Sequence, residues 1–262
     1  MNNENPLLNA ALLGRGVRYY DCVDSTNRCA KQLAAEGAPH MTLVLAEAQT
    51  EGRGRRGRAW LSRAGVGVWM SLIVRPDVRP DRAAELVMVT AVALCGALSA
   101  LTGKGAQIKW PNDVHFGGKK LSGTLLETGG ALGADASIEY AVIGVGINVI
   151  GDEFPPELPD AASIESAMGI TLARSRVVEC FMEKFERLYA RWEEGGLAEI
   201  MPHYREQSST LGKAVRAFCP DGEWIGVAED IAADGALLLR EADGRLRPLY
   251  AGDVSIRDAK TP

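Results

Sequence analysis

The most constraining feature of the sequence is a short run of arginine and glycine, Gly52–Arg58, which reads GRGRRGR. It holds four guanidinium groups within seven residues of a chain whose formal net charge is -5. Guanidinium groups this close together repel one another and are costly to bury unless an anion joins them. Apolar segments typical of strands flank the run at Met41–Ala46 and Val66–Val74. A solvated basic loop is the ordinary interpretation of such a run, but these flanks pin it to a core and favour a clamp for an anion.

The composition is that of an ordinary globular protein. With 262 residues, 47% of them hydrophobic and 24% charged, the chain is long enough for one large or two unequal domains. Its five cysteines are scattered and form no CxxC pair, and its three histidines lie far apart. We therefore expect reduced thiols, a cytoplasmic protein and no metal site made by protein ligands alone.

Charge and hydropathy exclude other classes. The acidic balance is unlike that of a general nucleic-acid binder, whose surface is basic. The longest apolar stretch, Leu86–Leu101, is short for a membrane span, and the first twenty residues lack a secretory pattern. We expect no membrane association.

The apolar periodicity predicts an α+β fold, in which helices pack on a mixed or antiparallel sheet. Helices are expected after the Asp24–Asn27 caps, from Asp81 to about Thr102, over Arg174–Trp192 and over Leu197–Gln207. The remaining apolar segments are expected to be strands: Val17–Cys22, Met41–Ala46, Gly67–Val74, Gln107–Trp110, Asp113–Phe116, Lys120–Glu127 and Glu139–Val149.

After Leu211 the pattern changes to five short strands, separated by turn sequences such as Pro220-Asp221-Gly222 and Asp243-Gly244. Five strands in about 45 residues indicate a small β-barrel. We place the domain boundary near Ser209, so that residues 1–208 form a catalytic domain and residues 209–262 a small C-terminal domain.

The glycines of the run also match the GxGxxG dinucleotide fingerprint, and Asp77 lies about where a ribose-binding acid would be sought. The fingerprint has to open a helix, whereas the segment after Arg58 leads into a strand. The chain also lacks a GxxxxGK[ST] loop and a GxSxG elbow. The dinucleotide-binding, P-loop and serine-hydrolase interpretations are therefore disfavoured.

Polar clusters stand at the ends of several expected elements. Each has an ordinary structural explanation as a cap, a turn, a hairpin tip or a bulge, and their order along the chain is what gives them meaning. They are Ser25-Thr26-Asn27, Gln49 with the arginine run, Lys109–Asp113, Lys119–Gly123 and Gly144–Asn148.

In that order these motifs, with Trp60 and the C-terminal Gly252–Arg257, closely resemble the biotin protein ligases (biotin–acetyl-CoA-carboxylase ligases). The resemblance spans roughly residues 18–257. It implies a catalytic domain like those of class II aminoacyl-tRNA synthetases and biotinyl/lipoyl ligases, followed by a small barrel resembling Src-homology domains. It also implies a two-step reaction: biotin and MgATP give biotinyl-5'-AMP, and the biotinyl group then passes to a lysine of a biotin carboxyl carrier protein, such as that of acetyl-CoA carboxylase.

The resemblance also implies residue roles. Arg53, Arg55 and Lys120 are the expected catalytic cations, with Lys119 on the opposite face of the strand. The expected biotin site adds Ser25, Thr26, Asn27, Gln49, Gly52, Gly54, Gly123, Gly144 and Gly146. ATP is expected to contact Arg55, Arg58, Trp60, Lys109, Asn112, Asp113, Asn148 and Arg257, with Mg²⁺ arriving on ATP near Asp113. Such a chain needs no nucleophile, because the carboxylate of biotin attacks; it needs fixed cations, and a loop that orders on binding.

Two departures and two alternatives stand beside this resemblance. Ser122 and Thr124 stand where many members have apolar residues. About twenty residues precede the first motif, so we expect no DNA-binding domain and no repressor activity. The resemblance implies a monomer or a weak homodimer. The alternatives are a lipoate or octanoate transferase of the same fold, which needs a long apolar tunnel, and an Arg-Gly RNA-binding module, which would bind in a salt-sensitive manner.

Overall fold

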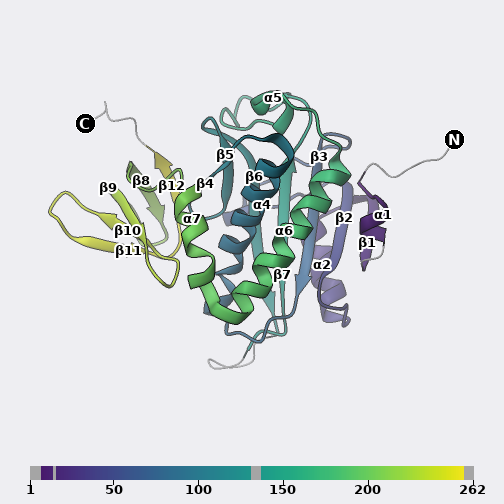
Figure 1. The fold of residues 1–262 in the computed structure, drawn as a ribbon, viewed down its shortest axis with the longest axis horizontal. Helices are drawn as coiled ribbons and strands as arrows, with labels where there is room; N and C mark the ends of the chain where they lie inside the picture. The colour runs from purple at the N-terminus through teal and green to yellow at the C-terminus, as the bar shows by residue number, and fades with distance from the viewer. Residues whose placement is uncertain (1–6, 14–15, 131–136, 257–262) are drawn as a thin grey trace.

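The computed structural model describes residues 7–13, 16–130 and 137–256, which form two β-sheets with helices packed around the larger one (Figure 1). The larger sheet has seven strands in the order β1-β2-β3-β7-β6-β5-β4. Its strands are β1 Val17–Val23, β2 Thr42–Gln49, β3 Gly67–Val74, β4 Gln107–Lys109, β5 Asp113–Phe116, β6 Lys119–Gly129 and β7 Tyr140–Asn148. Only β1 and β2 run parallel, and the other neighbours are antiparallel. The expected α+β class with a mixed sheet is confirmed.

Helices cover both faces of this sheet (Figure 1). One face packs against α4 Leu86–Thr102, which in turn packs against α6 Arg174–Gly195. The other face carries α2 Thr26–Ala35, which contacts β2, β3 and β7. Because α4 lies between the sheet and α6, it is apolar on nearly all sides. The segment Pro80–Thr102 is long and apolar enough to span a membrane, but most of it is buried inside the fold, as in a core helix.

The long helix expected from Asp81 begins one residue earlier and is interrupted. Arg79 is its N-cap, and Pro80 occupies the first helical position, where the missing N–H of proline is tolerated. The segment divides into α3 Pro80–Ala83 and α4. Sequence reasoning missed α5 Ile164–Met168, a five-residue helix too short to show a period. A capping box between Ser163 and Ser166 begins it.

The C-terminal strands form a separate five-stranded antiparallel sheet in the order β11-β10-β9-β8-β12. They are β8 Ala214–Cys219, β9 Gly222–Ile231, β10 Leu237–Arg240, β11 Leu246–Leu249 and β12 Asp253–Ile256. The five expected strands are present, but no pairing of β11 with β12 closes a barrel within the described residues. The remaining elements are α1 Ala10–Leu13, η1 Arg55–Gly57, η2 Gly196–Glu199 and α7 Met201–Gln207.

The small sheet lies beside the β4 end of the large one (Figure 1) and shares its core. Val215, Ala217 and Leu237 are fully buried and belong to the same apolar cluster as α4. The junction is also hydrogen-bonded, because the Trp110 amide donates to Oγ1 of Thr210 at 3.0 Å. We propose residues 1–208 and 209–262 as the two domains, joined by this common core.

Candidate active site

A cavity of about 320 Å³ opens on the α2 face of the large sheet, under the Arg-Gly loop. Successive strand residues point to opposite faces, so Gly144, Gly146 and Asn148 of β7 line the cavity, while Ile143 and Ile147 join the core under α4. Nearly every residue that the sequence suggested for the site lines this cavity: Ser25, Thr26, Asn27, Gln49, Arg53, Gly54, Arg55, Arg58, Trp60, Lys109, Asn112, Asp113, Lys120, Gly123, Gly144, Gly146 and Asn148.

One end of the cavity is polar and buried. Ser25, Thr26 and Asn27 are at most 3% exposed, at the beginning of α2. Ser25 is the N-cap by position, but its side chain makes no capping hydrogen bond, so the ordinary explanation as a helix cap does not account for it. Oε1 of Gln49 accepts from the Thr26 amide at 2.8 Å, and Nε2 of Gln49 donates to Ser62 at 2.7 Å.

Asn27 is held by residues from two strands. Its Nδ2 donates to Glu127 of β6 at 3.0 Å, and its Oδ1 accepts from Ser71 of β3 at 2.6 Å. Oδ1 lies directly above Gly144, where an added Cβ would come within 2.0 Å of it. The glycine of β7 therefore makes room for the asparagine.

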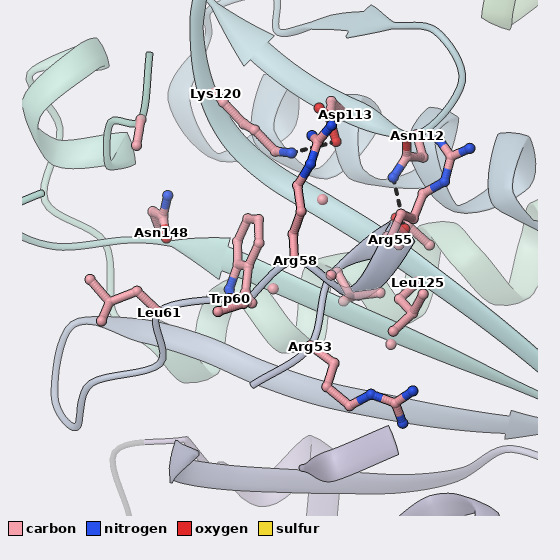
Figure 2. Close-up of a pocket in the computed structure, with 18 of the residues that line it drawn as sticks. Arg53, Arg55, Arg58, Trp60, Leu61, Asn112, Asp113, Lys120, Leu125 and Asn148 are labelled. Atoms are coloured by element: carbon pink, nitrogen blue, oxygen red, sulfur yellow. Dashed lines mark hydrogen bonds and ion pairs between the residues drawn. The ribbon is translucent and has the colours of Figure 1, made fainter. Parts of the chain in front are cut away.

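The four arginines of the loop all have partners in this structure. Nη1 of Arg53 lies 3.7 Å from Glu127, and Arg55 donates to Oδ1 of Asn112 at 2.8 Å (Figure 2). Arg56 and Arg58 both form ion pairs with Asp253 of the small sheet. Arg55 is the most enclosed, and burial lowers the pKa of its guanidinium. The loop thus contacts both sheets, and Arg53, Arg55 and Arg58 line the cavity.

Packing requires a glycine at position 52, because there is no space for a side chain. An added Cβ there would lie 2.3 Å from the Trp60 carbonyl oxygen, which is backbone and cannot move aside easily. Gly52 itself does not line the cavity. Gly54 has no comparably close neighbour, so the structure gives no steric reason for glycine at that position.

Lys120 and Asp113 meet at the centre of the cavity wall. Nζ of Lys120 lies 2.7 Å from Oδ1 of Asp113 (Figure 2). Burial alone would raise the pKa of Asp113, but the nearby His115 imidazole, whose Nε2 lies 4.0 Å from Oδ2, and the charge of Lys120 outweigh it and lower that pKa. Lys119 points to the other side and donates to the Pro159 carbonyl. The expected strand register, with Lys120 inward, is present.

Trp60 lies flat on the sheet rather than at the rim. Cβ atoms added at Gly146 and Gly123 would fall 2.3 Å and 3.1 Å from its indole ring. Its ring lies 5.4 Å from Nζ of Lys120, and its buried Nε1 has no hydrogen-bond partner in the part of the chain that is described. From the sequence, Gly123, Gly144 and Gly146 were expected to let the ligand approach the sheet closely. In this structure the absence of their side chains makes room for Trp60 and Asn27, and all three glycines still line the cavity.

The rest of the cavity lining is of mixed polarity. Asn112 and Asn148 are buried and donate to the carbonyl groups of Thr124 and Ala162, and Lys109 lies nearby in the lining. Leu61, Phe154 and Leu158 add apolar surface. Arg257 lies outside the described residues. Within the described ranges, no three His, Cys, Asp or Glu side chains gather as a metal site.

Several residues around the cavity were not found from the sequence. Ser71 is fully buried, and the sequence signal that could have marked it is its place as a lone serine inside an apolar strand. Glu127 belongs to no local motif, and Asp253 lies in the Gly252–Arg257 motif but was given no role of its own. Their importance arises from contacts with Asn27 and with the arginine loop, which are far away in sequence.

Comparisons with known proteins agree with the fold and the cavity. The family model for the biotin/lipoate A/B protein ligase family matches residues 19–148. The model for the biotin protein ligase C-terminal domain matches residues 210–257. These matches place the chain among the ligases that attach biotin or lipoate to proteins.

Individual relatives narrow the class. The chain is 35% identical to a biotin–[acetyl-CoA-carboxylase] ligase of Paracoccus denitrificans, over 85% of this chain and 93% of that one. It is also 35% identical to a protein of the same name from Mycobacterium tuberculosis, over 92% and 90%. A solved biotin protein ligase from Aquifex aeolicus, in complex with biotin and ATP, superposes with a TM-score of 0.77 at 27% identity, over 93% and 99%. The chain belongs to the biotin protein ligase family.

Proposed function

We propose that this chain activates biotin with MgATP to biotinyl-5'-AMP, releasing pyrophosphate, and then transfers the biotinyl group to one lysine of a biotin carboxyl carrier protein. Membership of the biotin protein ligase family supports the ligase activity. The observation that carries the residue roles is that Arg53, Arg55 and Lys120 line the same cavity as the buried polar group Ser25–Asn27 and Gln49.

The first step brings two anions together. The carboxylate of biotin attacks the α-phosphorus of ATP, so the P–O bond to pyrophosphate breaks as the acyl–phosphate bond forms. Repulsion between the carboxylate and the triphosphate has to be offset by fixed cations. We assign this role to Arg53, Arg55 and Lys120, whose N–H groups form charge-assisted hydrogen bonds of roughly 1.5–3 kcal/mol each.

The polar end of the cavity suits the ureido ring of biotin, which carries both N–H donors and a carbonyl acceptor. We assign Ser25, Thr26, Asn27 and Gln49 to it, since their hydroxyl and amide groups can supply both kinds of partner. The side chains of Thr26, Asn27 and Gln49 are already fixed by hydrogen bonds among themselves and with Ser62 and Ser71. A pre-arranged set of this kind avoids the entropic cost of ordering side chains on binding.

The nucleotide is assigned to the mixed part of the cavity, where Arg58, Lys109, Asn112, Asn148 and Trp60 lie. Asp113 is the carboxylate beside Lys120, and one of its oxygens is already engaged. A single carboxylate fits Mg²⁺ that keeps its phosphate and water ligands. We therefore propose that Mg²⁺ arrives with ATP, near Asp113, where it supplies charge neutralisation. Arg257 is proposed as a further phosphate contact.

In the second step, the neutral amine of the carrier lysine attacks the acyl carbon, AMP leaves, and the amine loses a proton as the amide forms. Lys120, hydrogen-bonded to the departing phosphate, would stabilise the charge that develops on it. The loop Gly52–Arg58, ordered over the adenylate, would keep water away from the mixed anhydride.

The carrier domain of acetyl-CoA carboxylase, or of a related biotin-dependent enzyme, is the proposed protein substrate. We place the reaction in the cytoplasm because all five cysteines are free. The lipoate or octanoate alternative fits less well, because the buried end of the cavity is polar.

One incubation tests the proposal against both alternatives. The chain is mixed with MgATP, an apo carrier domain and either biotin or lipoate, and the mass of the carrier is measured. A gain equal to one biotinyl group, absent when the target lysine of the carrier is replaced by arginine, is the expected result. A gain only with lipoate would favour the lipoate alternative. No gain with a carrier that a known ligase modifies would refute the proposed function.

A further inference from the structure

Glu127 is a partly buried carboxylate at the polar end of the cavity, and the mechanism above gives it no role. It stands on β6, on the cavity face of the sheet, and its side chain is 17% exposed. Its Oε2 accepts from Nδ2 of Asn27 at 3.0 Å, and its Oε1 accepts from Lys31 at 3.0 Å. Nη1 of Arg53 also lies 3.7 Å from Oε1, so the carboxylate connects β6 to Asn27 and Lys31 of α2 and to the arginine loop.

The chemistry of a carboxylate restricts what Asn27 can do. An ionised carboxylate only accepts hydrogen bonds, so it can face the NH₂ group of an amide but not its oxygen. The carbonyl of Leu125 acts in the same sense, 3.4 Å from Nδ2 of Asn27. Both groups select the same orientation of the Asn27 amide, and Glu127 is the charged one.

This orientation determines which atom of the Asn27 amide faces the cavity. With Nδ2 turned toward β6, Oδ1 lies above Gly144, which lines the cavity, and accepts one hydrogen bond from Ser71. An amide oxygen has a second lone pair, so it can also accept from a donor in the cavity. The opposite orientation would present N–H groups there instead.

We infer that Glu127 is a positioning residue, which holds the Asn27 amide so that its oxygen faces bound biotin and accepts from a ureido N–H. The inference rests on the proposed function, because it takes biotin as the ligand. It makes Glu127 a determinant of biotin affinity that acts through Asn27 without touching the ligand.

Two variants of Glu127 separate its acceptor oxygen from its charge. Glu127→Gln keeps one oxygen for Asn27 and loses the charge, whereas Glu127→Met has a similar length and no acceptor of comparable strength. We expect Glu127→Met to raise the KM for biotin about five- to tenfold and to change the KM for ATP less than twofold. Glu127→Gln should recover most of the loss.

Lys31→Met is the matched control on the other side of the carboxylate. It removes one of the two cations near Oε1, the other being Arg53 at 3.7 Å, and leaves the contact between Glu127 and Asn27 intact. We expect less than a twofold change in the KM for biotin. Thermal unfolding of each variant, and calorimetric titration with biotin alone, show whether a loss of affinity reflects the site or the fold.

A double-mutant cycle gives the decisive reading. If Glu127 acts through Asn27, the change Glu127→Met should have little further effect on biotin affinity once Asn27→Ala is present. Full additivity of the two changes would overturn the inference, as would equal loss in Glu127→Met and Glu127→Gln, or an equal rise in the KM for ATP. A wild-type chain that does not biotinylate the carrier would instead refute the proposed function, which the same assay reveals first.

Discussion

Nζ of Lys120 lies 2.7 Å from the carboxylate of Asp113, and the two side chains come from the adjacent strands β6 and β5 (Figure 2). The strand pairing contains a bulge between Val114 and His115, so that His115 is opposite Lys120 and Asp113 is opposite Gly123. Gly123 leaves space there for the two charged side chains, since an added Cβ would lie 3.3 Å from each of them. Lys120 is therefore held in the cavity before any ligand arrives.

This placement predicts different effects at two neighbouring lysines. Lys120→Ala should lower kcat for biotinyl-adenylate formation by at least about a hundredfold, because it removes a fixed cation from the site of charge development. Lys119→Ala should stay within about threefold of wild type, since that side chain is exposed and donates to the Pro159 carbonyl. Pyrophosphate release measures both. A larger loss in Lys119→Ala would mean that the register of β6 is wrong by one residue.

The packing of Asn27 against β7 predicts the effect of a single methyl group. In Gly144→Ala the new Cβ would approach Oδ1 of Asn27 to 2.0 Å, and Asn27 cannot turn away without breaking its bonds to Ser71 and Glu127. We expect a loss of about 1–3 kcal/mol in the free energy of unfolding and weaker biotin binding.

The control for this substitution is Gly105→Ala, because Gly105 has no atom within 4 Å of an added Cβ. Urea unfolding and biotin titration of both variants give the comparison. Unchanged biotin affinity in Gly144→Ala would show that Asn27 does not depend on this clearance.

The strands were predictable from the sequence because burial leaves a strong local pattern. All eight residues of β3 are buried, and the sequence there is an unbroken apolar run apart from Gly67 and Ser71. The helix α5 was not predictable in the same way, since its five residues depend on a capping box rather than on a period. The order of the strands in the small sheet was not predictable, because strand count alone does not determine which edges pair.

The site residues were predictable as a set only because their motifs follow the order seen in a family. Local sequence could not show that Glu127 holds Asn27, one hundred positions away, or that Asp253 pairs with Arg56 and Arg58. Contacts of this length depend on the whole fold. Trp60 was expected to lie near the adenine. Its contact with Gly123 and Gly146 depends on the pairing of β6 with β7, which local sequence does not determine.

The pairing of Asp253 with two arginines predicts how the Arg-Gly loop opens. Exposed ion pairs contribute about 0.2–1 kcal/mol, so Asp253→Asn should leave global stability nearly unchanged. Opening of the loop should become about two- to fivefold more frequent, and trypsin should cut after its arginines faster by the same factor when cleavage is slower than closing. Limited proteolysis of the ligand-free chain, followed by mass measurement, tests this.

Glu229→Gln is the matched control for Asp253→Asn, since it removes the partner of Arg240 elsewhere on the small sheet. Cleavage in the loop should not change in this variant. An equally faster cleavage in both variants would indicate a general loosening of the sheet. It would contradict a specific role of the Asp253 ion pairs in holding the loop closed.

The contacts of Glu127 predict a change in stability with pH. Burial alone would raise the pKa of this carboxyl, but the hydrogen bond from Asn27 and the charge of Lys31 outweigh it, with a smaller effect from Arg53, and lower the pKa below its usual value. A carboxyl with a lowered pKa in the folded state stabilises the fold at pH above the usual value for glutamate, about 4.3. Below that pH the unfolded chain takes up the proton first, so this contribution decreases as the pH falls through the lowered pKa and then is lost.

The free energy of unfolding of wild type should therefore exceed that of Glu127→Gln near neutral pH, and the two curves should approach each other on acidification. Urea unfolding of both proteins between about pH 7 and pH 3.5 measures the difference; a gap that stays constant over this range would show that the carboxylate does not titrate with the contacts seen here.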